Sequence, residues 1–353
     1  MTLAPEILFE RRGAAGLVTL NRPQALNAVT HPMVRALATK LAEWAKDPAV
    51  TRVIVRAAGE RAFSAGGDIR VLYDLGRGGK HADALRFWRE EYTLNTLIKR
   101  YPKPYIALID GIVMGGGVGV SIHGSHRVAG DRFQFAMPEV GIGFFPDVGA
   151  TWFLPRMPGQ TGAYCALTGE RLKAADALAT GIVTHHVASS RWRDLTEALC
   201  GTTPVDAVLS AFHEPLGLGP LTVRRKAVDA LFALDHVEDL VASLDDEAIS
   251  GSESAGFAGA TAALMRSKSP TSLKIALAQM RFGKKASFTD CMKMEFRIVS
   301  RVVRGHDFYE GVRALIIDKD RQPRWRPETL ADVSDTEIAH HFAPLESGEL
   351  ELP

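Results

Sequence analysis

Short apolar runs alternate with amphipathic segments along the first half of the chain. The runs expected to form strands are residues 16–20, 52–57, 105–109 and 132–136. Between the first two runs, apolar residues recur at helical spacing from Val34 to Trp44, which predicts a helix over about residues 31–46. Pro102 and Pro104 would end any helix before the third run. This order predicts an α/β core, but its spacing is not that of a Rossmann fold.

Strand-like runs disappear after about residue 200. The segments expected to be helical are residues 221–234, 236–250, 271–282 and 287–304. The last of them begins at Ser287 with a capping-box pattern and has one apolar face. We therefore divide the chain into a core over residues 1–200 and a helical region over residues 201–353. The stretch 201–220 is rich in Gly, Pro and Thr and is expected to be the linker.

Composition and charge narrow the class of protein. The chain has 353 residues, of which 46% are hydrophobic and 24% charged, as in an ordinary globular protein. Its 42 basic and 41 acidic residues give a net charge of +1, which argues against broad binding to nucleic acid or to an anionic membrane. A small local basic patch for a phosphorylated ligand is still compatible with this balance.

The chain ends and the cysteines bear on location. Residues 1–10 lack the features of a secretory signal or a transit peptide, and no apolar stretch approaches the length of a membrane span. The final Glu-Leu-Pro is not a peroxisomal signal. Three cysteines, in no metal-binding or paired spacing, fit a reducing compartment. We expect a cytoplasmic protein.

Glycines are concentrated in two segments that each follow a strand-like run. One contains Gly66 and Gly67, and the other runs from Gly115 to Gly119. Backbone N–H groups from two such loops could converge on one carbonyl oxygen as an oxyanion hole. The alternative is that both are only tight turns and packing points. Neither fits a nucleotide-binding loop, and Ser121 lacks the final glycine of a nucleophile elbow, which argues against a serine hydrolase.

Two carboxylates lie in the mostly apolar segment 137–149. A carboxylate such as Glu139 or Asp147 avoids apolar surroundings unless it has a partner or a function. Burial raises a carboxyl pKa, and two neighbouring carboxyls push their pKa values apart. One could then act as base or nucleophile while the other holds a proton. The alternative is that Glu139 caps a helix and Asp147 begins the turn before Gly149.

The histidines give no comparable signal. His123 and His126 lie three residues apart on an expected helix, but no carboxylate or cysteine completes a metal site at standard spacing. His185 and His186 are expected to form a loop pair. We interpret all four as structural or solvent-facing residues.

Together these segments resemble the enoyl-CoA hydratase/isomerase (crotonase) superfamily and, within it, the 3-hydroxyisobutyryl-CoA hydrolases. The resemblance runs almost from end to end of the chain. It is carried by the N-R-P-Q-A-L-N-A segment after Leu20, the A-G-G-D and M-G-G-G-V-G loops, and the segment M-P-E…I-G…F-P-D-V-G. The late segments Asp307–Ala314, Asp318–Asp320 and Pro323–Trp325 are typical of the hydrolase subgroup alone.

The resemblance implies a spiral of repeated ββα units with CoA bound across the core, and a C-terminal region that serves as lid or oligomerisation element. It implies that the N–H groups of Gly67 and Gly116 bind the thioester carbonyl oxygen. Glu139 matches the family's catalytic glutamate, and Asp147 matches an aspartate that the hydrolase subgroup adds. Glu91 matches a further acidic position near the substrate; the alternative is a solvated helix residue.

One departure decides the expected chemistry. Gly119 stands where hydratases have a second glutamate. The resemblance therefore implies hydrolysis of a short 3-hydroxyacyl-CoA thioester. The family favours the 3-hydroxyisobutyryl thioester of valine breakdown, and a 3-hydroxypropionyl or other short 3-hydroxyacyl thioester is the alternative. Glu139 would attack the carbonyl or activate a water, and Asp147 would bind the 3-hydroxyl or help to position water. Glu91 would orient the hydroxyacyl group.

CoA is the carrier part of this substrate, and no metal, flavin or nicotinamide cofactor is implied. A homo-oligomer, whether trimer, hexamer or dimer, is left open. Two rival functions are an enoyl-CoA hydratase or isomerase that relies on Glu139 alone, and a non-catalytic acyl-CoA-binding protein. Retention of both carboxylates and both glycine loops argues against the second rival.

Overall fold

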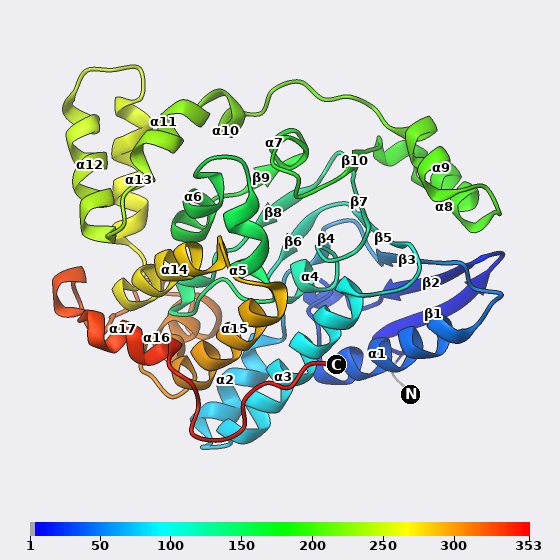
Figure 1. The fold of residues 1–353 in the computed structure, drawn as a ribbon, viewed down its shortest axis with the longest axis horizontal. Helices are drawn as coiled ribbons and strands as arrows, with labels where there is room; N and C mark the ends of the chain where they lie inside the picture. The colour runs from blue at the N-terminus through cyan, green and yellow to red at the C-terminus, as the bar shows by residue number, and fades with distance from the viewer. Residues whose placement is uncertain (1–3) are drawn as a thin grey trace.

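The computed structural model describes residues 4–353, and its strands form two sheets (Figure 1). The first three residues of the N-terminal stretch expected to lack a targeting signal lie outside this range. The six-stranded sheet contains β1 (Ile7–Arg12), β2 (Ala15–Leu20), β3 (Arg52–Ala57), β5 (Tyr105–Ile109), β7 (His126–Ala129) and β10 (His185–His186), in that order. The four-stranded sheet contains β4 (Ala62–Ser64), β6 (Ile112–Met114), β8 (Gln134–Ala136) and β9 (Leu172–Lys173).

From β3 to β8, consecutive strands alternate between the two sheets. β3, β5 and β7 pair in parallel in the larger sheet, while β4, β6 and β8 pair in parallel in the smaller one. Each pair of strands is followed by helical structure, so the chain advances in repeated ββα turns. Only β1 with β2 and β8 with β9 pair antiparallel among the described strands. The expected α/β spiral is confirmed.

Helices follow the strands through the first half of the chain. They are α1 (His31–Lys46), α2 (Ile69–Arg77), α3 (His81–Lys99), α4 (Gly116–Gly119), α5 (Ala150–Phe153), α6 (Thr161–Thr168) and α7 (Ala174–Ala179). α1 has the predicted bounds because the Thr30 side chain accepts the Met33 N–H as N-cap, and the helix buries the predicted face from Val34 to Trp44.

The second half is helical, and no strand follows β10 in the described range. Its helices are α8 (Trp192–Cys200), α9 (Val205–Phe212), α10 (Pro220–Val223), α11 (Arg225–Leu231), α12 (Val237–Ile249), α13 (Ala255–Arg266), α14 (Pro270–Gly283), α15 (Phe288–Val302), α16 (Asp307–Val312) and α17 (Asp335–Phe342). α12, α14 and α15 confirm three expected helices. None of the helices within residues 4–353 is long and apolar enough to cross a membrane.

Four expectations were wrong in detail. The helix expected over 221–234 is interrupted at Arg224 and forms α10 and α11. The expected linker contains α9, because Val205, Val208 and Leu209 form an apolar face that packs on the larger sheet. His123 lies in a turn after α4 and His126 begins β7, so neither lies on the expected helix. The pair at 185–186 is β10 instead of a loop.

One apolar core joins the two halves of the chain. It runs from Val18 on β2 through Tyr92 on α3 to Met265, Phe296 and Leu350 in the second half. A smaller cluster lies between the larger sheet and α8 with α9. In Figure 1 the helices α15 and α16 lie beside α2 and α3, in agreement with the contacts of α15 with α3 and of α16 with α2.

Candidate active site

A single cavity brings together all five residues proposed from the sequence. Gly67, Gly116, Glu91, Glu139 and Asp147 line a cavity of about 210 Å³. The rest of its wall is mostly apolar and includes Leu72, Phe87, Trp88, Phe144, Leu315 and Ile316. A mostly apolar cavity with a few convergent polar groups is the usual form of a small-molecule site.

The two glycine loops meet at this cavity. A Cβ atom built on Gly116 would lie 3.1 Å from the Gly67 nitrogen, so the two backbone segments are in close approach. Gly66 and Gly115 have φ angles of +120° and +44°, which glycine adopts without strain. Gly116 is the first residue of α4, and neither its N–H nor that of Gly67 has an acceptor within the described residues. Two N–H groups are therefore available to one carbonyl oxygen.

The N-terminal N-R-P-Q-A-L-N-A segment supports the first of these loops. The buried Asn27 side chain donates to Ala58 O and Ala62 O, both at 2.9 Å. Leu26 O accepts the Ala65 N–H at 2.9 Å. The segment thus fixes the backbone immediately before Gly67.

Glu91 is buried and not solvated. It lies on α3, is 2% exposed, and its Oε1 has no hydrogen-bond partner within the described residues. That oxygen would be 2.6 Å from a Cβ atom on Gly116, so the carboxyl group lies directly against the second glycine loop. Burial raises the pKa of Glu91 well above its usual range, and the charges of Asp147 and Glu295 raise it further.

Glu139 opens a short 3₁₀-helix, Glu139–Ile142, whose N-cap position is Pro138. The Glu139 side chain is 6% exposed and its Oε2 has no partner in the described part of the chain, so it does not cap this helix. Burial, and then the charge of Asp147, raise the pKa of Glu139 well above its usual range. A carboxyl group of this kind is suited to exchange protons near neutral pH.

Asp147 is held by a phenol. The Tyr92 hydroxyl donates to Asp147 Oδ2 at 2.9 Å, and both side chains are buried. Burial raises the pKa of Asp147 to about 7, although the Tyr92 hydrogen bond lowers it. Asp147 O also accepts the Ala150 N–H at 2.9 Å, so the residue does begin a turn as well.

Comparison with known proteins places this geometry in a family. A family model described as enoyl-CoA hydratase/isomerase matches residues 15–342. The chain belongs to this family. Similar curated proteins include the 3-hydroxyisobutyryl-CoA hydrolase, mitochondrial, of Danio rerio, 43% identical over 98% of this chain and 92% of the relative. The Homo sapiens protein of the same description is 40% identical over 99% of this chain and 91% of the relative.

Two crystal structures share the fold along the whole chain. One is of a carnitinyl-CoA dehydratase from Mycobacterium thermoresistibile, with a TM-score of 0.92, 40% identity and 99% coverage of both chains. The other is of an enoyl-CoA hydratase from Rhodobacter sphaeroides 2.4.1, with a TM-score of 0.91, 38% identity and coverage of 99% of this chain and 100% of that one. The enoyl-CoA hydratase/isomerase fold is thereby established for this chain.

Position 119 has no room for the second glutamate of a hydratase. A Cβ atom on Gly119 would lie 2.8 Å from Asn95 Nδ2 and 2.9 Å from Val148 Cβ. Both neighbours are buried, so neither can move aside without disturbing the core. The structure thus explains physically why this family member carries glycine there.

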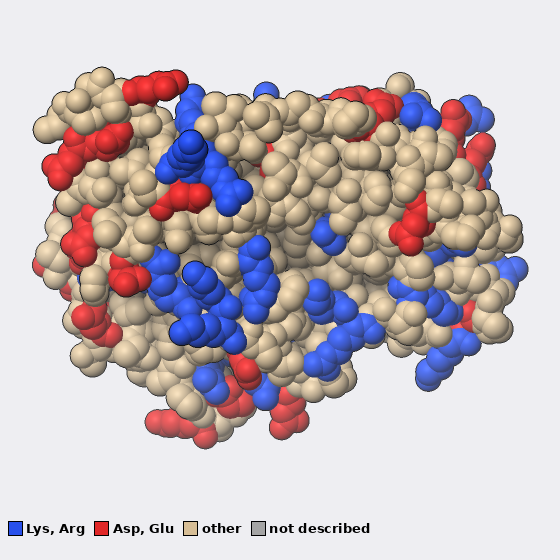
Figure 2. Space-filling view, turned by 45° about the horizontal axis from the view of Figure 1, so that its top comes forward, with Lys and Arg blue, Asp and Glu red and all other residues tan. Residues whose placement is uncertain are grey.

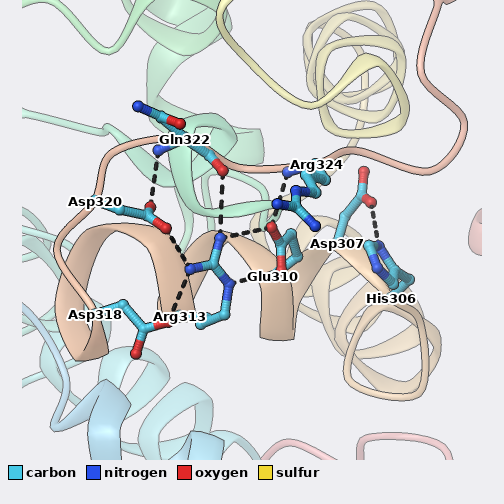
Figure 3. A network of polar contacts seen from close by, with 8 residues as sticks. All are labelled: His306, Asp307, Glu310, Arg313, Asp318, Asp320, Gln322 and Arg324. Carbon is cyan, nitrogen blue, oxygen red and sulfur yellow. Dashed lines mark hydrogen bonds and ion pairs between the residues drawn. The ribbon is translucent and has the colours of Figure 1, made fainter.

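Residues of the late segments Asp307–Ala314, Asp318–Asp320 and Pro323–Trp325 form a polar network (Figure 3). Arg313 donates to both Glu310 oxygens at 2.8 and 2.9 Å, to Asp318 at 2.8 Å and to Asp320 at 2.6 Å. Glu310 also accepts the Arg324 N–H at 2.8 Å. The network fastens the segment after α16 to the helix itself.

This network fixes a wall of the cavity. Residues 313–317 form a short π-helix, a form often found at functional sites, and Leu315 and Ile316 on it line the cavity. α16 packs on the Glu139 segment so closely that a Cβ atom on Gly311 would be 2.3 Å from the Ile142 carbonyl carbon. The helical region therefore contributes directly to the site.

Four further buried polar side chains around the Asp147 segment were not predicted from the sequence: Tyr92, Asn95, Gln279 and Glu295. Glu295 accepts the N–H groups of Gly149 at 2.7 Å and Thr151 at 2.9 Å. Burial, and then the charge of Asp147, raise the pKa of Glu295 to about 8. The sequence did contain a signal for Glu295. It lies four residues before Val299, and therefore on the apolar face of α15, where a carboxylate is unexpected.

Proposed function

We propose that the protein hydrolyses the thioester of a short 3-hydroxyacyl-CoA, most directly 3-hydroxyisobutyryl-CoA, to the free hydroxy acid and CoA. The observation that carries the proposal is one cavity lined by Gly67 and Gly116, whose N–H groups have no acceptor within the described residues, and by Glu139 and Asp147, two buried carboxyls of raised pKa. The names of the Danio rerio and Homo sapiens relatives support the same substrate. The reaction belongs to valine breakdown.

In this proposal the N–H groups of Gly67 and Gly116 bind the thioester oxygen as negative charge develops on it. Removal of one such donor typically costs about 10²–10³ in kcat. Glu139 attacks the carbonyl carbon, the C–S bond breaks, and CoA leaves as a thiolate that takes up a proton. Water then hydrolyses the resulting anhydride. In the alternative route, Glu139 takes a proton from a water that attacks the same carbon.

Asp147 and Glu91 give the proposed site its preference for a hydroxyl group. Both carboxyls lie in the cavity, and Tyr92 holds Asp147 in one orientation. A buried carboxyl can accept a hydrogen bond from the 3-hydroxyl of the acyl group or from a water beside it. The apolar wall formed by Phe87, Trp88 and Phe144 suits a short branched carbon chain.

A second candidate function is enoyl-CoA hydration, favoured by the description of the Rhodobacter sphaeroides structure. Hydration in this family uses two glutamates, and the space at Gly119 is filled by Asn95 and Val148. Asp147 offers its carboxylate from a different loop. We therefore infer that the thioester carbonyl, and not a double bond, is the reacting group.

The CoA phosphates need cations near the cavity mouth. Figure 2 shows that lysine and arginine side chains gather on part of one face, although the net charge is only +1. We propose that CoA phosphates bind basic side chains without a metal or other cofactor. Assembly as a dimer, trimer or hexamer stays a prediction, and light scattering coupled to gel filtration would test it.

The location of the protein is a separate prediction. The Danio rerio and Homo sapiens relatives are described as mitochondrial, which does not support the cytoplasmic location expected from the sequence. Fractionation of the source cells with an antibody against the native protein would test the location directly.

The function is tested by release of CoA from 3-hydroxyisobutyryl-CoA, followed with a thiol reagent, with hydration of crotonyl-CoA measured in parallel. We expect CoA release without hydration. Hydration of crotonyl-CoA without CoA release would overturn the proposal and favour the hydratase. Binding of CoA thioesters with neither reaction would favour a non-catalytic binding protein.

A further inference from the structure

The segment that carries Asp147, residues 146–151, is held by four buried side chains. These are Tyr92 on α3, His123 after α4, Gln279 on α14 and Glu295 on α15. Gln279 Nε2 donates to Pro146 O at 2.9 Å, and His123 Nε2 lies 2.7 Å from Val148 O. Burial lowers the pKa of His123 to about 3, so the ring is neutral and donates that hydrogen bond. The backbone on both sides of Asp147 is thus fixed by distant parts of the chain.

Glu295 binds two backbone N–H groups of this segment. Its Oε2 accepts the Gly149 N–H at 2.7 Å, and its Oε1 accepts the Thr151 N–H at 2.9 Å. The side chain is 0% exposed, and a carboxyl group is buried at a cost unless its oxygens have such donors. Glu295 does not line the cavity. Glu295 can therefore act on the reaction only indirectly, through the segment that it binds or through its electrostatic effect on Glu91.

The bound segment has an unfavourable backbone conformation. Val148 has a φ angle of +51°, which is rare for a β-branched residue. Such a conformation persists only when the surroundings impose it, and it is found preferentially at active sites. His123 and Glu295 bind the carbonyl oxygen and the N–H group of the peptide between Val148 and Gly149. Together they impose the turn that directs Asp147 into the cavity.

We infer that Glu295 is a positioning residue that fixes residues 147–151 so that Asp147 meets the 3-hydroxyl of the acyl group. The inference rests on the proposed hydrolysis and extends it to substrate selection. It also assigns a role to α15, a helix more than 140 residues away in sequence from the segment that it orders.

The decisive variant is Glu295→Gln. Glutamine has the same size and keeps one acceptor, but its NH₂ group faces the second backbone N–H, so one hydrogen bond is lost. A misplacement of about 1 Å at a reacting group can cost about 10²-fold in rate. We expect kcat/KM for 3-hydroxyisobutyryl-CoA to fall by about 10²-fold. Hydrolysis of isobutyryl-CoA, which lacks the hydroxyl, should change little.

A double-mutant cycle separates positioning from general stability. If Glu295 acts through Asp147, Glu295→Gln should add little to the loss already caused by Asp147→Asn. Asp290→Asn, an exposed carboxylate on the same helix, is the matched control and should leave both substrates unaffected. Should Glu295→Gln not fold, Glu295→Asp keeps the carboxyl group on a shorter side chain and should show a smaller loss of the same discrimination.

Equal losses for both substrates, or losses that multiply independently with Asp147→Asn, would overturn the inference and make Glu295 structural. Absence of CoA release by the wild-type protein would instead overturn the proposed function, and the inference with it. The two failures are therefore distinct in a single set of assays.

Discussion

At the scale of single residues, burial is what makes the carboxyl groups of the site useful. An exposed carboxyl is fully ionised at neutral pH and has little tendency to exchange protons. Glu139 and Asp147 are buried, and burial raises the pKa of each. The pKa of each group is thereby brought closer to the pH range in which the group can both hold and release a proton.

Raised pKa values predict a particular pH profile. Glu139 must be ionised to attack the thioester or to activate a water, and its pKa lies well above the usual 4.5. We therefore expect kcat/KM to rise with pH through the neutral range. Activity measured from about pH 5 to pH 9 reports this ionisation in the free enzyme. A profile already flat above about pH 6 would indicate an ordinary carboxyl and contradict the assignment.

The same burial should lower stability at alkaline pH. The pKa of Asp147 is raised from 3.8 to about 7 on folding, so its contribution to stability is full below about pH 4 and is lost as pH rises through 7. Asp147→Asn stays neutral and still accepts the Tyr92 hydrogen bond. We expect its Tm to exceed that of the wild type by a few degrees at pH 8 and to match it at pH 4.

Thermal unfolding at both pH values checks this prediction. The control is Asp290→Asn, which removes an exposed carboxylate and should show no such pH dependence. An Asp147→Asn variant that is less stable than the wild type at pH 8 would show that the ionised carboxylate stabilises the fold.

Residue patterns predicted part of the site and missed the rest for a physical reason. Glycine-rich loops and carboxylates in apolar segments are visible in the sequence, and the five residues chosen on that basis line one cavity. Asn95 and Gln279 gave no such signal, because an isolated amide in a helix is usually exposed. Their role arises from packing against segments far away in the chain, which no local pattern encodes.

At the scale of elements, the polar network around Arg313 holds one wall of the cavity in place. Arg313 binds Glu310, Asp318 and Asp320 at once. The π-helix that begins at Arg313 carries Leu315, which lines the cavity. The planar guanidinium makes these contacts in directions that a lysine ammonium cannot reproduce.

Arg313→Lys should therefore loosen the wall without disturbing the catalytic groups. We expect KM to rise several-fold while kcat changes little, with faster hydrogen exchange in residues 313–326. Arg266→Lys, at an exposed pair with Asp245, is the control and should leave KM unchanged. A loss confined to kcat would place Arg313 in the chemistry and not in the wall.

Element boundaries were predictable where local signals decide them. α1 has the expected bounds because its cap and its apolar face are both local. The break at Arg224 was not predicted, and it leaves α10 as a short helix whose Leu221 and Thr222 N–H groups are bound by Asp176 on α7. A helix end set by a distant side chain leaves no local signal.

At the scale of the whole molecule, the core is continuous across the two halves of the chain. Residues from Val18 to Leu350 belong to one apolar cluster, and the helical region supplies both Glu295 and part of the cavity wall. The division near residue 200 describes a change of secondary structure and stays a prediction as a domain boundary.

A shared core predicts that the two halves unfold together. Differential scanning calorimetry should show one cooperative transition, with equal calorimetric and van 't Hoff enthalpies. A substrate analogue that binds the cavity should raise the whole transition. Two resolved transitions, only one of which responds to the analogue, would show that the helical region is an independent domain.

The measurement that tests the central claim most directly is kcat for CoA release from 3-hydroxyisobutyryl-CoA by Glu139→Gln. The amide keeps the size of the side chain but can neither attack the carbonyl nor take a proton from water. We predict a loss of about 10²–10⁴-fold with the fold intact, while Glu170→Gln, an exposed control, retains full activity. Near-normal turnover by Glu139→Gln would contradict the account, because the reaction would then not depend on Glu139.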